Sequence, residues 1–220
     1  MNLASLIDHT LLKPETTLPQ IQKLCAEAKE HQFFSVCINP YWIVDAKKFL
    51  NGSGVKVCTV IAFPLGAGLP LSKMHAAQDA VKAGADELDM VLNIGAAKEA
   101  HWNFIEHEIH EVVSAAQGRT VKVILETCLL TDTEIVECSK AAQKAGAHFV
   151  KTSTGLNTGG ATVEAVRLMR QTVGDKMGVK ASGGIKDKAT AEAMVAAGAN
   201  RLGTSSGVAI IQGKAGGPGY

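Results

Sequence analysis

The sequence predicts an α/β fold built as a single (β/α)8 barrel, and three observations lead to this prediction. The chain has 220 residues, within the roughly 200 to 400 residues of such barrels. Short apolar runs alternate eight times with longer segments of helical spacing, as parallel strands covered by helices do. No linker rich in Pro, Gly or Ser separates the units, which favours one closed barrel (residues 1–212) over a doubly wound open sheet. Residues 213–220 are expected to form a flexible tail.

The predicted strands and helices follow one another in a regular order. We expect strands at Leu6–Leu11, Phe34–Ile38, Val55–Ala62, Glu87–Leu92, Val121–Glu126, Phe149–Thr152, Gly178–Ala181 and Arg201–Gly203. Segments rich in Ala, Glu, Lys and Gln between them predict helices, among them Ser72–Ala83, Asn103–Ala116 and Thr131–Ala145. Thr131 and Glu134 form a capping box where the last of these helices starts.

An internal repeat relates three of the units. Segments 82–85, 144–147 and 196–199 read Lys-Ala-Gly-Ala, Lys-Ala-Gly-Ala and Ala-Ala-Gly-Ala, and each glycine is expected to close a helix. The fifth residue after each glycine is Asp89, Lys151 or Gly203, towards the C-terminal end of a strand. Lys180 has a comparable position in the seventh strand.

Strand C-terminal ends face the active-site mouth of a barrel, and charged side chains are rarely buried unless paired. We therefore expect Asp89, Lys151 and Lys180 to converge there. A buried ion pair that only holds strands together, with Lys180 reaching solvent, is the alternative.

Two lysines beside one carboxylate suit imine chemistry. A lysine with its ordinary pKa of about 10.4 is almost entirely protonated at neutral pH and is then a poor nucleophile. A second ammonium about 4 Å away opposes that charge by about 4 kcal/mol at an effective dielectric constant of ~20, and desolvation acts in the same direction. One lysine can therefore become a nucleophile, while Asp89 moves protons directly or through water.

Two glycine- and serine-rich loops predict a phosphate site. Residues 182–185 (Ser-Gly-Gly-Ile) follow the seventh strand and residues 203–207 (Gly-Thr-Ser-Ser-Gly) follow the eighth. Small residues leave backbone N–H groups accessible, and a helix start after each loop favours an anion. Barrels commonly hold phosphate at these two loops, although either loop alone also fits a plain turn.

The composition excludes several classes of partner. The 22 Lys and Arg residues nearly balance the 21 Asp and Glu residues, so no bulk field attracts nucleic acid or an anionic membrane. The first residues do not resemble a secretion signal, and no uncharged run approaches the ~18 residues of a membrane helix. Five cysteines without CxxC spacing fit reduced thiols. We expect a cytoplasmic protein that binds small molecules.

The chain resembles the deoxyribose-phosphate aldolases from beginning to end. Seven segments carry the resemblance: 7–12 (IDHTLL), 35–40 (SVCINP), 59–64 (TVIAFP), 87–91 (ELDMV), 150–155 (VKTSTG), 179–184 (VKASGG) and 203–206 (GTSS). The resemblance implies reversible cleavage of 2-deoxy-D-ribose 5-phosphate to acetaldehyde and D-glyceraldehyde 3-phosphate by a class I, Schiff-base mechanism. It implies no metal or organic cofactor. It also implies a homodimer, since relatives are often dimers, although no sequence feature identifies the interface.

The resemblance also assigns roles to individual residues. Lys151 looks like the imine-forming lysine, Lys180 like the second lysine that lowers its pKa, and Asp89 like an acid/base group that works through a water. Asp8 resembles a carboxylate that positions the second lysine, and Thr154 a hydroxyl that contacts the substrate's alcohol groups. The residues similar to the family's phosphate cradle are Gly155, Gly183, Gly184, Ser205 and Ser206.

Three further positions are compared with the family. Cys37 ends the second strand, where the family often carries a thiol facing the pocket, but a small core residue fits equally well. Tyr220 matches a terminal tyrosine that visits the active site of relatives and aids proton transfer at the imine's α-carbon, with a disordered end as the alternative. Leu156 stands where some relatives place a lysine, so phosphate contact from that position is not expected.

Two motifs are discounted and three alternatives remain. Residues 107–110 (His-Glu-Ile-His) lack the HExxH spacing of zinc proteases, and His107 lies opposite the apolar face of its helix. Residues 155–160 lack the GxGxxG order of dinucleotide sites. The alternatives are an aldolase or transaldolase-like enzyme that uses a different sugar phosphate, an inactive sugar-phosphate sensor, and a metal-dependent aldolase. The last would need a His/carboxylate set at the strand ends, which the sequence does not offer.

Overall fold

The computed structural model describes residues 2–217, and its centre is a closed barrel of eight parallel strands in chain order. The strands are β1 (Ile7–Leu11), β2 (Ser35–Ile38), β3 (Lys56–Ile61), β4 (Glu87–Val91), β5 (Thr120–Ile124), β6 (Phe149–Lys151), β7 (Gly178–Ser182) and β8 (Arg201–Thr204). Because β8 pairs with β1, the sheet has no free edge. The predicted barrel and all eight strands are confirmed, with ends within two residues of those expected.

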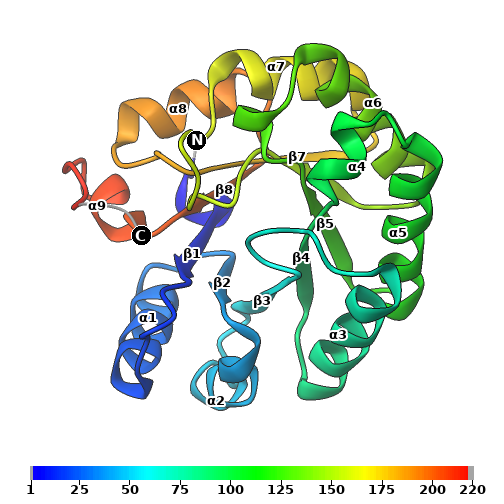
Figure 1. The fold of residues 1–220 in the computed structure, drawn as a ribbon. Coiled ribbons are helices and arrows are strands. Elements are labelled where there is room, and N and C mark those ends of the chain that lie inside the picture. The colour runs from blue at the N-terminus through cyan, green and yellow to red at the C-terminus, as the bar shows by residue number, and fades with distance from the viewer. Residues whose placement is uncertain (1, 218–220) are drawn as a thin grey trace.

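Helices surround the barrel on its outer side (Figure 1). They are α1 (Leu18–Glu30), α2 (Ile43–Phe49), α3 (Pro70–Ala83), α4 (Ile94–Lys98), α5 (Trp102–Ala115), α6 (Asp132–Lys144), α7 (Val163–Val173), α8 (Lys188–Ala196) and α9 (Gly207–Ile211), with single 3-10 turns η1 (Ala4–Leu6), η2 (Pro40–Trp42) and η3 (Thr127–Leu129). The predicted capping box of α6 is present, since the Glu134 N–H donates to Thr131 Oγ1 and the Thr131 N–H donates to Glu134 Oε2. None of the helices within residues 2–217 combines the length and apolar character needed to cross a membrane.

The three repeat glycines close their helices in the same way. Gly84, Gly146 and Gly198 have φ of +104°, +83° and +114°, a region that costs glycine little. In each unit the N–H of the following alanine donates to a carbonyl five residues earlier at 3.0 Å. This bond marks a Schellman-type end. Because each strand begins at nearly the same distance from its glycine, the fifth residue after the glycine lies at an equivalent level in the barrel.

The apolar core lies mainly between the barrel wall and the helices. Ile105, Ile109 and Val112 on α5 are buried in it, while His107 is exposed, as expected for this helix. The interior of the barrel contains a small apolar cluster and a group of charged side chains. Around β1 to β3 a small cluster contains Leu12, Cys37, Cys58 and Val60 with Phe63 packed against it. Strand β1 and strands β4 to β8 direct charged side chains inward, because alternate residues of a strand face the same side.

Candidate active site

Asp89 is the centre of a buried group of ammonium ions. Its Oδ2 accepts hydrogen bonds from the Nζ atoms of Lys151 and Lys180, both at 2.8 Å, and its Oδ1 accepts one from Lys122 Nζ at 2.8 Å. Lys151 and Lys180 are register partners on β6 and β7, as Asp89 and Lys122 are on β4 and β5. The expected convergence of Asp89, Lys151 and Lys180 is therefore present. Lys180 is fully buried, so the alternative in which it reaches solvent is wrong.

A second carboxylate, Asp8 on β1, holds Lys180 from the other side. Lys180 Nζ donates to Asp8 Oδ2, which is the contact expected for these two residues. Asp8 Oδ1 accepts from Ser35 Oγ at 2.7 Å and from Arg201 at 2.9 Å. All four side chains are buried. Asp8 therefore fixes the position of the ammonium that also contacts Asp89.

The ion network extends toward the N-terminal face of the barrel. Arg201 lies 3.0 Å from Glu87 as well as close to Asp8, and its guanidinium stacks on the Phe34 ring, 3.4 Å from the ring centre. Glu87 also contacts Lys122 Nζ at 2.6 Å. The stacked guanidinium shields the network from water on this side, so the groups are held by one another rather than by solvent.

The charges of this network fix its protonation. Burial alone would raise the pKa of Asp89, but the ammonium groups of Lys122, Lys151 and Lys180 hold that pKa well below its usual range. Burial would lower the pKa of Lys180, whereas Asp8 and Asp89 raise it well above its usual range. At neutral pH Asp89 is thus a carboxylate and Lys180 is an ammonium.

Replacing Asp8 with asparagine should destabilise the protein by about 3 kcal/mol, because it leaves buried cations with one partner fewer. Burial opposes the shift, but Lys180, Lys122 and Arg201 lower the pKa of Asp8. A carboxylate with a lowered folded pKa stabilises the fold above its unfolded pKa of about 3.9 and loses that contribution as pH falls further. The difference in melting temperature between the wild type and Asp8→Asn should be constant from about pH 5 to pH 8 and shrink below pH 4. A difference that changed mainly around neutral pH would contradict this assignment of charge.

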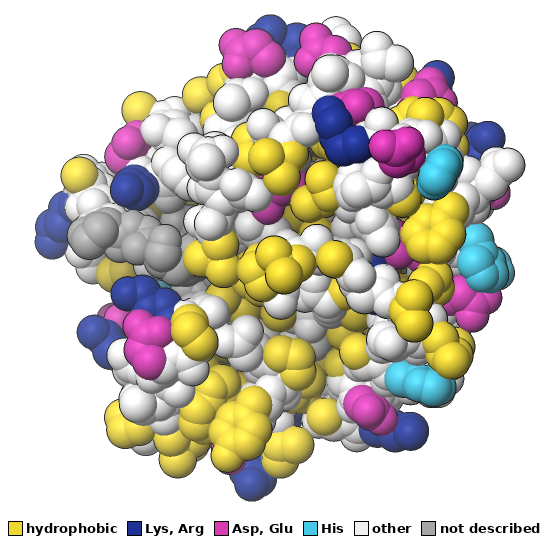
Figure 2. Space-filling model, viewed as in Figure 1, with side chains coloured by type: hydrophobic (Ala, Val, Ile, Leu, Met, Phe, Trp, Pro, Cys, Tyr) yellow, Lys and Arg dark blue, Asp and Glu magenta, His cyan; other side chains and the backbone are white. Residues whose placement is uncertain are grey.

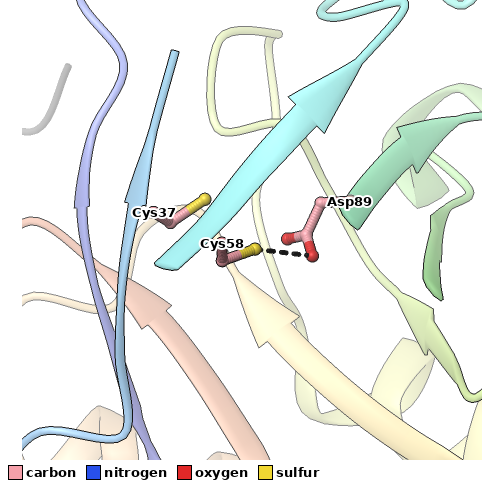
Figure 3. A group of neighbouring side chains, drawn as sticks. All are labelled: Cys37, Cys58 and Asp89. Atoms are coloured by element: carbon pink, nitrogen blue, oxygen red, sulfur yellow. Dashed lines mark hydrogen bonds between the residues drawn. The ribbon is translucent and has the colours of Figure 1, made fainter. Parts of the chain in front are cut away.

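Two thiols border the Asp89 carboxylate. Cys58 Sγ donates to Asp89 Oδ1 at 3.1 Å, and Lys122 Nζ lies 3.4 Å from the same sulfur. The Sγ atom of Cys37 completes a group in which the two sulfurs and one Asp89 oxygen lie within 4.8 Å of one another (Figure 3). Such atoms can bind a metal ion, but both Asp89 oxygens already accept hydrogen bonds from ammonium groups. A cation there would face their repulsion, so the donor set does not fit a metal.

Glu126 and Thr154 form a separate pair at the mouth. Glu126 follows β5 and has φ of +59°, a left-handed backbone that is uncommon for a residue other than glycine. Its buried carboxylate accepts from Thr154 Oγ1 at 2.5 Å and from the Thr154 N–H at 3.2 Å. The Thr154 hydroxyl proton points at Glu126, and its oxygen accepts from the Leu156 N–H at 3.2 Å. One lone pair of that oxygen therefore remains for an incoming alcohol.

Removing the Glu126 carboxylate should lower kcat/KM about ten-fold, the value of roughly one good hydrogen bond, because the Thr154 hydroxyl is no longer oriented. Glu126→Gly tests this without adding backbone strain, since glycine adopts φ of +59° readily. Glu126→Ala should lose the same activity but keep the left-handed strain that Glu126 already has, so it should be about 1 kcal/mol less stable than Glu126→Gly. Steady-state kinetics with thermal unfolding of both variants would separate the two effects. Wild-type kcat/KM in Glu126→Gly would show that the pair has no role in substrate positioning.

A cavity of about 230 Å³ opens next to this pair. Four of the five predicted phosphate-site residues line it, namely Gly155, Gly183, Gly184 and Ser205. Ser206 is not on the lining; it is buried, and its N–H donates to Thr204 Oγ1 at 2.9 Å. The lining also includes Lys186, the one ionised side chain on it among the described residues.

The cavity has a fixed shape because its loops touch. A Cβ atom on Gly160 would lie 2.3 Å from the Gly183 carbonyl oxygen, and the Ala161 N–H donates to that oxygen at 3.0 Å. The loops after β6 and β7 are thus joined by backbone contact that no larger residue allows. Leu156, the position that lacks the lysine of some relatives, is 44% exposed and does not line the cavity.

Sequence reasoning missed several residues of the site. Lys122 is a charged residue inside an apolar strand, the same signal that identified Asp89. Glu87 and Arg201 each begin a strand, and Cys58 lies in an apolar run, so none of the three stood out. Glu126 and Lys186 lie in loops without a motif of their own. Tyr220 lies outside the described residues.

Comparisons with known proteins agree with this geometry. Residues 3–213 match the model of the DeoC/LacD family aldolase. A deoxyribose-phosphate aldolase of Streptococcus gordonii is 58% identical over 214 residues, covering 97% of each chain, and one of Geobacillus sp. is 56% identical over 97% of this chain and 96% of its own. The deoxyribose phosphate aldolase of Aeropyrum pernix, described as tetrameric, has a similar structure (TM-score 0.90, 37% identity, 96% of this chain and 89% of that chain). The chain belongs to the DeoC/LacD family of aldolases.

Proposed function

We propose that the protein cleaves 2-deoxy-D-ribose 5-phosphate reversibly to D-glyceraldehyde 3-phosphate and acetaldehyde through a Schiff base on Lys151. The observation that carries this proposal is the position of three lysines on one carboxylate. Lys122 and Lys180 are fully buried, whereas Lys151 is 3% exposed. Lys151 is therefore the amine that an aldehyde in the mouth can reach, and Lys180 remains behind it as a fixed ammonium.

The charge balance of the network suits a neutral nucleophile. With Lys151 uncharged, the cations Lys122, Lys180 and Arg201 face three carboxylates, those of Asp8, Glu87 and Asp89. An ammonium at Lys151 adds an unmatched charge next to Lys180, with which it shares Asp89 Oδ2. When Lys151 gives up its proton, these six groups still form a complete set of ion pairs, and the free amine has a lone pair with which to attack.

The reaction begins when the Lys151 amine attacks the aldehyde carbon C1 of the open-chain sugar. Loss of water gives an iminium ion, which draws electrons from the C2–C3 bond as the C3 hydroxyl loses its proton. Asp89, acting through a water, accepts that proton, and the Thr154 hydroxyl accepts a hydrogen bond from a substrate alcohol. D-Glyceraldehyde 3-phosphate leaves, and the remaining enamine is protonated at C2 and hydrolysed to acetaldehyde. The Lys180 ammonium is available as a proton donor, since it shares Asp89 Oδ2 with Lys151.

The cavity lined by Gly155, Gly183, Gly184, Ser205 and Lys186 holds the phosphate in this proposal. Its loops follow β6, β7 and β8, whereas the nucleophile lies on β6 itself. A sugar phosphate can therefore place its phosphate on the loops and its aldehyde over Lys151. Cys37 and Ser206 support the walls of the site and take no chemical step. No organic cofactor is needed, because the iminium ion itself accepts electrons.

The first test is borohydride reduction in the presence of 2-deoxyribose 5-phosphate or acetaldehyde, followed by peptide mass mapping. A covalent adduct confined to Lys151, and absent from Lys151→Arg, would support the proposal. A folded protein that bound phosphate but gave no lysine adduct would indicate the inactive sensor. Loss of activity with a chelator would indicate the metal-dependent aldolase, and different cleavage products would indicate another sugar phosphate.

The C-terminal tail, residues 213–220, is proposed to bring Tyr220 to the imine. Its described part runs over the phosphate loops, since the Gly216 N–H donates to the Lys186 carbonyl at 2.7 Å. A Cβ atom on Gly216 would lie 2.1 Å from Ser206 Oγ, which shows how closely the segment approaches that loop. Tyr220→Phe should lower the rate of deuterium exchange at the α-carbon of acetaldehyde but leave borohydride trapping at Lys151 intact. An unchanged exchange rate would remove Tyr220 from the mechanism.

A homodimer is proposed from an exposed apolar surface. Tyr41, Leu65, Leu69 and Leu71 are 81%, 74%, 73% and 60% exposed, and hydrophobic side chains gather over α2 and the loop that leads into α3 (Figure 2). Apolar surface of this kind commonly marks an interface. Sedimentation of the wild type and of Leu69→Asp tests this, and a wild-type monomer would exclude it.

Cytoplasmic residence is proposed from the thiols. All five cysteines are free, as in a reducing compartment.

A further inference from the structure

Two cysteines beside the catalytic carboxylate have no step in the reaction above. Cys37 on β2 and Cys58 on β3 are register partners on neighbouring parallel strands, and both are fully buried. Their sulfur atoms lie within 4.8 Å of each other and of an Asp89 oxygen (Figure 3). Neighbouring strands are about 4.8 Å apart, a separation inside the range of about 4.4 to 6.8 Å between the Cα atoms of a disulfide. The backbone therefore already holds the two residues at bridging distance.

The two thiols are chemically unequal. The neighbouring Cys58 side chain lowers the pKa of Cys37, and the charge of Lys180 acts in the same direction against the effect of burial. Burial raises the pKa of Cys58 well above its usual range. Cys37 is thus the more readily ionised member, and Cys58 keeps its proton, which points at Asp89 Oδ1. An ionised thiol beside a protonated partner is the arrangement of a reactive cysteine with a resolving cysteine.

The remaining cysteines lack this arrangement. Burial raises the pKa of Cys25 to about 11 and that of Cys138 to about 12. Cys128 is exposed and lies in η3, outside the barrel strands. Within the described residues, Cys37 and Cys58 are the only two cysteines whose sulfur atoms lie together beside a carboxylate oxygen.

We propose that Cys37 and Cys58 form a reversible disulfide when a peroxide enters the barrel, and that this disulfide switches the aldolase off. The Cys37 thiolate attacks one oxygen of hydrogen peroxide, which forms a sulfenic acid and releases hydroxide. The Cys58 sulfur then attacks the Cys37 sulfur, and its proton and the sulfenic hydroxyl leave as water. Two thiols lose two electrons in total and the peroxide becomes two waters, since the hydroxide takes a proton from solvent. A peroxide is no larger than the acetaldehyde that reaches Lys151.

The disulfide inactivates the enzyme through Asp89. The bridge consumes the Cys58 proton, so Asp89 Oδ1 loses its hydrogen bond at 3.1 Å and keeps only Lys122 on that oxygen. It also draws the two sulfurs together in the small apolar cluster beside the carboxylate. Because Asp89 Oδ2 contacts both Lys151 and Lys180, a rotation of the carboxylate disturbs the nucleophile directly. Reduction of the bridge restores every bond.

The test is titration of the wild-type protein with hydrogen peroxide, with activity assays and non-reducing peptide mapping of each sample. We expect activity to fall at least ten-fold in step with a linked pair of peptides containing Cys37 and Cys58, and both changes to reverse with dithiothreitol. Cys128→Ser should behave like the wild type. Cys58→Ser should form no bridge, and peroxide should oxidise its Cys37 to a sulfinic acid that dithiothreitol does not restore.

The wild-type arm decides the proposal even if Cys58→Ser fails to fold. Undiminished activity in the peroxide-treated wild type would overturn it. So would inactivation with both thiols mapped as free, or with the bridge formed through Cys128 instead. Borohydride trapping of acetaldehyde on the reduced protein tests the Lys151 mechanism separately, so failure of the switch is distinguishable from failure of the imine mechanism.

Discussion

Lys151→Arg should abolish aldol cleavage, with kcat at least about 10⁴-fold below the wild type, the scale of loss seen when a nucleophile is removed. Arginine places a guanidinium opposite Asp89 Oδ2, where Lys151 Nζ lies at 2.8 Å. It remains protonated at any pH the protein tolerates, so it cannot attack an aldehyde. The variant should therefore fold and bind inorganic phosphate with wild-type affinity. The measurement is coupled detection of glyceraldehyde 3-phosphate, with phosphate binding by calorimetry.

The matched control is Lys144→Arg, the same change at an exposed position at the end of α6. It should leave both turnover and borohydride labelling unchanged. If Lys151→Arg kept a tenth of wild-type activity, the nucleophile would have to be another amine. If it lost phosphate binding as well, the loss of turnover would reflect disrupted loops, and the variant would no longer identify the nucleophile.

The barrel and the core of the site follow from periodic features of the sequence. The repeated glycine ends three helices with the same left-handed geometry, so counting five residues from it locates equivalent levels on β4, β6 and β8. This count identified Asp89 and Lys151, because a charged side chain at that level of the barrel is cut off from solvent. Lys122 is also a charged residue within an apolar strand. The repeated segment does not precede β5, however, so the level of Lys122 in the barrel could not be found by counting from a glycine.

Other parts of the site depend on three-dimensional contacts that no local pattern encodes. Arg201 starts a strand, where a charged residue usually meets solvent, and only the stacked Phe34 ring turns it into a buried partner of Asp8. Glu126 has a left-handed backbone that its residue type does not suggest. Its partner Thr154 is 28 residues away in the sequence. The pairing of Cys37 with Cys58 depends on the strand register, which places both in one row.

Asp89→Asn should cost both activity and stability. The amide has one oxygen where the carboxylate had two, and its NH2 group must point at Lys122 or at the Lys151 and Lys180 pair, whichever way the side chain turns. A buried ammonium left without its partner destabilises a protein by about 3–5 kcal/mol. Loss of the proton acceptor should lower kcat by about 10²–10⁴-fold. Urea unfolding and steady-state kinetics measure the two losses. Asp86→Asn, which removes charge from the partly exposed pair with Lys47, should cost less than about 1 kcal/mol.

The double variant Asp89→Asn, Lys122→Met separates the two roles of this carboxylate. Removing the Lys122 ammonium together with the Asp89 charge leaves one buried cation and one buried anion fewer, and Glu87 still has Arg201 at 3.0 Å as its partner. Stability should therefore recover by a few kcal/mol, on the order of the penalty for an unpaired buried charge. Activity should not recover, because no carboxylate remains within reach of Lys151. If turnover returned along with stability, Asp89 would act only by neutralising buried charge, and the proton acceptor would have to be sought at Glu126, the other carboxylate of the mouth.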